Sequence, residues 1–87
     1  MTANRKAQED AKAHPLRRFI LKQLATVDRP VTAEELRAAA MGIPEPQRPS
    51  AGALNYHLVI LVDAGFVVRV EGTGGPYALT EAGRKIA

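Results

Sequence analysis

The clearest hydrophobic pattern in the chain lies within residues 50–64. Three leucines recur there at intervals of four and three residues, which places them in one stripe along a helix: Leu54, Leu58 and Leu61. Ser50 belongs to the residue types that cap helix starts, and Gly65 can adopt the left-handed conformation that ends helices. The pattern therefore predicts a helix over about residues 50–64 that docks through its leucines.

Two further helical patterns precede this one. From His14 onward, apolar residues share one helix face, and Pro15 suits the first turn; the apolar positions are Leu16, Ile20, Leu24 and Val27. The second pattern begins with a capping box, in which Thr32 and Glu35 satisfy each other's backbone N–H groups, and it runs to about Ala40. Residues 42–49 then carry three prolines and a glycine, which predicts a loop, and it is longer than most helix-turn-helix connections.

A β-hairpin is expected after Gly65. Residues 66–70 read as a strand, residues 72–75 as a glycine-rich tip and residues 77–79 as the returning strand. Thr80 can cap a short final helix. The sequence predicts an α+β fold with a three-helix core, a two- or three-stranded β-wing and a short C-terminal helix. We expect the domain to span residues 14–87, with residues 1–13 forming an arm or an extra helix.

Length and composition place the chain among small globular domains. Its 87 residues are enough for one hydrophobic core. The start lacks the apolar region of a signal peptide, and the longest aliphatic run, at residues 58–62, is too short for a membrane span. With no cysteine, disulfides and thiolate ligands are excluded, which fits a reducing compartment. We therefore expect a cytoplasmic protein that does not enter membranes.

The formal net charge of +3 is unevenly distributed. Residues 1–29 carry seven Lys/Arg against three Asp/Glu, whereas residues 30–64 carry two against four. A basic excess at one end fits contacts with phosphates. It fits equally a solvated surface that keeps the protein soluble.

Four segments together resemble the ArsR-like winged helix-turn-helix regulators. NYHLVILVDAGFV (residues 55–67) resembles the family's SYHLRVLVEAGLV-type signature, in which the recognition helix leads into the wing. HPLRRFILKQLA (14–25) resembles the first helix, PVTAEELRAAA (30–40) the second, and YALTEAGRKIA (77–87) the last strand and closing helix. The resemblance implies a homodimeric transcriptional regulator of double-stranded DNA. It implies a recognition helix at about 50–64 in the major groove, and a wing at about 66–79 on the flanking backbone or minor groove.

Two groups of residues are candidates for DNA contacts. Asparagine can pair with adenine through two hydrogen bonds, and small residues allow close approach to base edges. The base-edge candidates on the predicted helix are Ala51, Gly52, Asn55 and Tyr56. The phosphate candidates are Arg17, Arg18, Gln47, Arg48, Ser50 and Arg69.

Catalytic and metal-binding patterns are not evident in the sequence. His14 and His57 lie 43 residues apart without a local acid–base partner, and Ser50 lacks the surroundings of a nucleophile elbow. No cluster of His, Asp or Glu has chelating spacing. We expect no enzyme, no cofactor and no metal, and we expect His57 to be a partly buried, hydrogen-bonded structural residue.

An alternative reading starts from the charge of the predicted recognition helix. No basic residue occurs between Ser50 and Ala64, Val59 stands where the resembled family has Lys or Arg, and Asp63 adds a negative charge. Val59 and Ile60 would then form an apolar patch. On this reading the chain is a winged-helix module that binds a protein and no nucleic acid.

Overall fold

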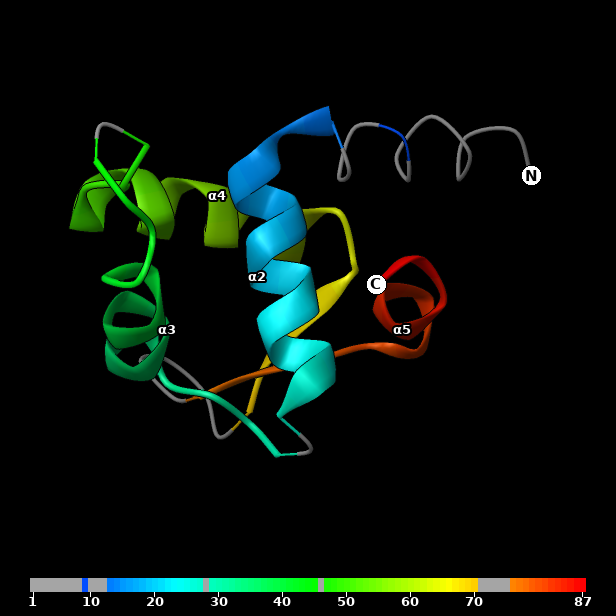
Figure 1. Cartoon of the computed structure of the whole chain (residues 1–87). Coiled ribbons are helices and arrows are strands. Elements are labelled where there is room, and N and C mark those ends of the chain that lie inside the picture. Colours follow the sequence, from blue (N-terminus) through cyan, green and yellow to red (C-terminus); the bar gives the residue numbers. More distant parts are fainter. Residues whose placement is uncertain (1–8, 10–12, 28, 46, 71–75) are drawn as a thin grey trace.

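Three helices, two antiparallel strands and a short helix follow one another along the chain in the computed structural model (Figure 1). The structure describes residue 9 and residues 13–27, 29–45, 47–70 and 76–87. The elements are α2 (Pro15–Thr26), α3 (Ala33–Ala40), α4 (Ala51–Asp63), β1 (Val67–Arg69), β2 (Tyr77–Leu79) and α5 (Glu81–Ile86). This order confirms the predicted α+β winged helix-turn-helix fold. The predicted tip at 72–75 and most of the arm at 1–13 lie outside the described residues.

The predicted apolar stripes form the core. α2 crosses α4 and packs against β2, while α3 packs against α4 (Figure 1). The apolar stripes predicted for the first and third helices are buried at Leu16, Ile20, Leu24, Leu54, Leu58 and Leu61, and α3 adds Leu36 and Ala40 to the core. Leu21, which lies beside the predicted stripe of α2, is buried as well, whereas Val27, the C-cap residue of α2, is half-buried against the core. The buried face of α2 is therefore wider than predicted, since it contacts both α4 and the sheet.

Side-chain caps fix where the helices begin. The Thr32–Glu35 capping box is complete, with both reciprocal hydrogen bonds present. Arg29 adds an ion pair to the same carboxylate at 2.5 Å, and these hydrogen bonds from Arg29 and Thr32 lower the pKa of Glu35 to about 2. Ser50 and Thr80 cap α4 and α5 as predicted, each accepting a backbone N–H at 3.1 Å. The sequence did not identify the cap of α2.

The sheet of the wing has two strands. β1 and β2 pair antiparallel, with Val67 opposite Leu79 and Arg69 opposite Tyr77. Val31 forms a single antiparallel bridge with Tyr77, through reciprocal backbone hydrogen bonds of 2.8 and 2.7 Å. The sequence predicts two or three strands for the wing. Among the described residues, this single bridge takes the place of a third strand. It attaches the wing to the segment that leads into α3.

A compact junction joins α4, the wing and α5. Gly65 ends the helical turn after α4 with a φ of +86°, in the conformation expected for a terminating glycine. The Thr80 hydroxyl donates to the Gly65 carbonyl at 2.6 Å, and the Thr80 N–H donates to the Phe66 carbonyl at 3.0 Å. The start of α5 thus fixes the turn from α4 into β1.

Candidate nucleic-acid interface

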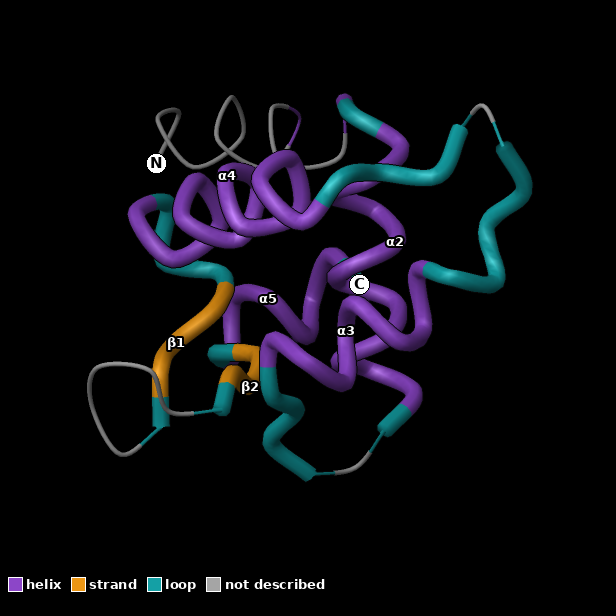
Figure 2. The backbone as a smooth tube through the Cα atoms, turned by 90° about the vertical axis from the view of Figure 1, so that its left-hand side faces the viewer, coloured by secondary structure: helices purple, strands orange, loops and turns teal. Residues whose placement is uncertain are grey.

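Helix α4 has one buried face and one exposed face. Leu54, Leu58 and Leu61 are at most 2% exposed, while Tyr56 is 62% exposed. All four predicted base-edge residues lie on the exposed side: Ala51, Gly52, Asn55 and Tyr56. Figure 2 shows α4 along one edge of the molecule, with β1 continuing from its end. The helix is therefore positioned by the core and presents short or hydrogen-bonding groups outward.

The exposed face of α4 is nearly uncharged. Asp63, its last residue, is exposed, and α4 contains no lysine or arginine. The positive end of the helix dipole lies at its first turn. Any attraction of this helix for phosphates therefore depends on that first turn and on side chains from neighbouring elements.

Arginines from two other segments lie near the first turn of α4. Arg37 of α3, Arg48 of the connecting segment, Ser50 and Ala51 line one shallow depression. Arg37 is exposed, and its Nη2 lies 3.9 Å from Glu34 Oε1. Arg37 could not be predicted from the sequence, because a helical pattern does not tell which neighbour an exposed position faces. The structure thus adds one cation to the predicted phosphate contacts.

The side chain of Arg48 is held in place by the connecting segment. Its Nε donates to the Ile43 carbonyl at 3.0 Å, and its Nη1 lies 4.0 Å from Glu45 Oε1. The Ser50 hydroxyl oxygen already accepts a hydrogen bond from the Ala53 N–H, so its O–H remains able to donate to another partner. Gln47 is exposed in the same segment. The structure therefore brings Gln47, Arg48 and Ser50 together just before α4.

The remaining phosphate candidates lie in separate places. Arg17 is half-buried on α2, while Arg18 lines a different depression beside Ile86 of α5. Arg69 is exposed on β1, with its guanidinium carbon 5.9 Å from the centre of the Tyr77 ring. The predicted set is thus not a single patch. It is spread over α2, the connection and the wing, and each assignment stays a prediction.

His57 departs from its expected environment. It is only 8% exposed, with its ring centre 4.2 Å from that of His14 and 5.2 Å from that of Tyr56. Its Nδ1 is buried without a hydrogen-bond partner among the described residues, so at this atom His57 differs from the hydrogen-bonded residue that the sequence predicts. Burial lowers the pKa of His57, and the charges of His14 and Arg17 lower it further.

This lowered pKa predicts a pH-dependent stability. The unfolded chain takes up a proton on His57 below its ordinary pKa of 6.5, whereas the folded protein resists doing so. The free energy of unfolding is therefore expected to fall as the pH drops below about 6.5 towards the lower pKa of the folded protein, by at most about 1.4 kcal/mol per pH unit. Urea titrations from about pH 7.5 to about pH 5.5, on wild type and His57→Gln, measure this decrease. Equal slopes for the two proteins would contradict the assignment to His57.

Two further features are absent from the described part of the chain. Over the residues that the structure describes, no helix is long and apolar enough to cross a membrane. Among those same residues, no three side chains of His, Cys, Asp or Glu gather as metal ligands would. The absence of a metal site in the whole protein stays a prediction.

Comparison with known families identifies the class of the domain. The sequence model of a helix-turn-helix domain family matches residues 13–70, from the start of α2 through β1. The chain belongs to this family. Helix-turn-helix domains bind DNA in regulators and are typically not enzymes. Searches of curated proteins and of solved structures gave no match.

Proposed function

We propose that this protein is a transcriptional regulator of the ArsR-like type that inserts α4 into the major groove of double-stranded DNA. The observation that carries the proposal is the two-sided character of α4 within a helix-turn-helix domain. Its leucines are buried, while Asn55 and Tyr56 are exposed beside each other on the outer face. A recognition helix needs this combination, because it must be held rigidly and still reach base edges.

Base reading is assigned to the first two turns of α4. The Asn55 amide can donate one hydrogen bond to adenine and accept another from it. The Tyr56 hydroxyl can donate or accept a hydrogen bond. Gly52 supports the same assignment, because a Cβ built there meets nothing closer than the Ser50 Oγ at 4.0 Å. Packing inside the protein therefore does not require a glycine at this position. The missing side chain at Gly52 and the small methyl group of Ala51 leave room for a base pair to approach closely.

Phosphate binding is assigned to side chains around α4. Gln47, Arg48 and the Ser50 hydroxyl precede the helix, and Arg37 lines the same depression as Arg48. Arg69 extends the contacts along the wing, which we assign to the flanking backbone or minor groove. Arg17 and Arg18 add contacts from α2. Such contacts set the affinity and the register, whereas the base edges set the sequence preference.

The resemblance to ArsR-like regulators supplies the rest of the proposal. We propose a cytoplasmic homodimer whose two copies of α4 read the halves of a pseudo-palindrome. The domain would span residues 14–87, with the arm at 1–13 and α5 in the dimer contact. Two copies double every phosphate contact, which matters for a recognition helix that carries no lysine or arginine.

Two substitutions test the division between base and phosphate contacts. Asn55→Ala is expected to relax the sequence preference by about 1–3 kcal/mol at one base pair, because one bidentate contact is lost. Arg69→Ala is expected to weaken binding to all sequences alike, because phosphate contacts carry no sequence information. Fluorescence anisotropy with a selected operator and its single-base variants measures both. The residue assignment is wrong if both variants bind every duplex as wild type does.

A protein-binding module is the second candidate function. The outer surface of α4 and β1 exposes three large apolar side chains, Tyr56, Val59 and Val68, at 62%, 37% and 46%. Exposed apolar side chains of this kind fit a protein partner better than they fit phosphates. Val59→Lys separates the two functions: it is expected to tighten DNA binding in a regulator and to weaken partner binding in an interaction module. Pull-down measures partner binding and fluorescence anisotropy measures DNA binding, both on the same variant.

A further inference from the structure

Val59 is an exposed apolar residue on the outer face of α4. Its side chain is 37% exposed, although most valines of helical cores are buried. Residues three and four apart lie on the same face of a helix, so Val59 shares its face with Asn55 and Tyr56, which are also exposed. Val59 therefore lies about one turn, or about 6 Å, beyond Asn55 in the same row of outward side chains.

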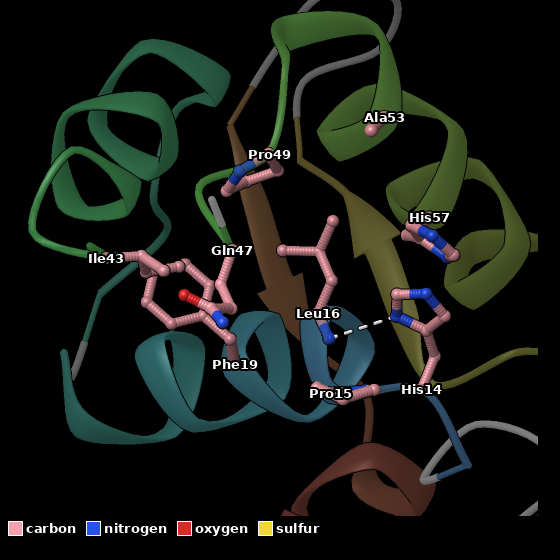
Figure 3. Close-up of a pocket in the computed structure, with 9 residues that line it drawn as sticks. All are labelled: His14, Pro15, Leu16, Phe19, Ile43, Gln47, Pro49, Ala53 and His57. Atoms are coloured by element: carbon pink, nitrogen blue, oxygen red, sulfur yellow. Dashed lines mark hydrogen bonds between the residues drawn. The ribbon is translucent and has the colours of Figure 1, made fainter. Parts of the chain in front are cut away.

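The opposite flank of α4 faces the protein. Leu58 is buried, and Ala53 and His57 line a cavity beside Leu16 of α2 (Figure 3). These side chains cannot meet a duplex that lies along the outer face of the helix. Contacts made by the middle of α4 therefore depend on the row that contains Val59.

An isopropyl group can distinguish base pairs in the major groove only through apolar contact. Thymine presents a 5-methyl group there, whereas the edges of guanine, adenine and cytosine present hydrogen-bond donors and acceptors. A donor or acceptor covered by an isopropyl group loses its hydrogen bonds to water and gains none in return. A valine on the base-reading face of a helix therefore favours a thymine.

The charges of α4 favour A·T pairs as well. Guanine is read most often by arginine or lysine, and α4 contains neither. Arg48, which precedes the helix, is held by its Nε on the Ile43 carbonyl at 3.0 Å. Asp63 lies one turn beyond Val59 and is exposed, so phosphates repel that end of the face. The stretch of α4 that can approach base edges therefore ends at Val59.

We propose that Val59 is a specificity-determining residue of α4, and that its isopropyl group contacts the 5-methyl group of a thymine in each half of the DNA site. Because base pairs are stacked about 3.4 Å apart, this thymine lies about two steps from the adenine assigned to Asn55. The contact removes two apolar groups from water, and it needs no charge on the helix. This role of Val59 rests on the proposed function.

Removing single methyl groups from the DNA tests the contact directly. Binding sites are first selected with the full chain from a pool of random duplexes. Each thymine of a selected site is then replaced by uracil, which pairs as thymine does and lacks only the 5-methyl group. At one position, changed in both half-sites, we expect the Kd to rise about tenfold, because two buried methyl groups are lost. Fluorescence anisotropy measures each Kd.

Three variants assign the methyl contact to one side chain. Val59→Ala is expected to bind the thymine and uracil sites with Kd values within about twofold of each other. Val68→Ala makes the same change at a valine of β1 that is 46% exposed, so it is the matched control and should discriminate as wild type does. Val59→Lys should bind all sequences more tightly, through its charge, and lose the preference for the methyl group. Thermal unfolding checks that each variant is folded.

The outcomes separate the role of Val59 from the proposed function. If wild type binds its selected sites equally well with uracil at every thymine, the role of Val59 is overturned and the regulator stands. The same holds if Val59→Ala discriminates as wild type does, or if the selected sites carry no A·T pair where α4 binds. If no duplex is bound even at the lowest salt, the proposed function is overturned together with the role of Val59.

Discussion

Replacing Gly83 by alanine is expected to destabilise the protein by about 3 kcal/mol, because overpacking against a fixed backbone is costly. A Cβ at this buried position would lie 2.1 Å from the Phe66 carbonyl oxygen and 3.0 Å from its carbon. That oxygen cannot easily move, because it accepts the Thr80 N–H at 3.0 Å. For a domain of this size the melting temperature should fall by roughly 10–20 °C, which a thermal unfolding curve measures.

Gly52→Ala provides the matched control for this prediction. A Cβ at Gly52 meets nothing closer than 4.0 Å, and the residue lies in the first turn of α4. Alanine there is expected to leave the stability unchanged or to raise it by about 0.5–1 kcal/mol, through helix propensity. If Gly83→Ala melted within about 2 °C of wild type, the close contact of α5 with Phe66 would be refuted.

The contact at Gly83 links stability to function. Gly65, Phe66, Thr80 and Gly83 form one junction, in which α5 fixes the turn that leads from α4 into the wing. Losing this contact would release the wing from α4 before it affected the leucine core. We therefore expect Gly83→Ala to lower DNA affinity even at temperatures where the protein is folded.

Features that depend on neighbouring residues in the sequence could be predicted from it. The Thr32–Glu35 capping box, the Ser50 and Thr80 caps and the positive φ of Gly65 each follow from a residue type at a fixed offset from a helix end. The leucine stripe of α4 followed from helical periodicity, and it also determined which face is exposed. The fold class followed because these local signals agree with one another.

Features that depend on packing between distant segments could not be predicted. The sequence gives no indication that His14 stacks on His57, since 43 residues separate them. Arg37 faces the first turn of α4 only because of how α3 packs on α4. Gly83 reads as an ordinary glycine in a weak helical pattern, and its role depends on the position of Phe66. In each case, helical periodicity depends only on residues that are near in sequence. The contact partner of a side chain depends on how distant segments pack.

The distribution of charge around α4 separates specificity from affinity in the proposed complex. Within α4, the exposed side chains other than Asp63 carry no charge, so base edges would be read by hydrogen bonds and close approach. Attraction to the duplex would come from arginines on α2, α3, the connection and β1. Non-specific and specific binding should therefore share nearly the same dependence on salt.

The largest expected effect on DNA binding is its dependence on salt. Five of the assigned phosphate contacts per protomer are arginines, at positions 17, 18, 37, 48 and 69, which makes ten in a homodimer. Each neutralised phosphate contributes about −0.9 to the slope of log K against log salt, so a slope of about −9 is expected. The affinity for mixed-sequence duplex DNA should then fall by about 10⁵-fold between 50 and 200 mM salt. Fluorescence anisotropy across a salt series measures the slope.

Variants show which side chains produce that slope. Arg69→Ala should make it shallower by about two, one for each protomer. Arg29→Ala, which lies outside both the assigned set and the proposed dimer contact and is paired with Glu35, should leave it unchanged. A slope half as steep would indicate that a monomer binds. If no binding is detected even at the lowest salt, the exposed Tyr56, Val59 and Val68 become the contact surface for a protein partner, because an apolar patch needs no counterions to release.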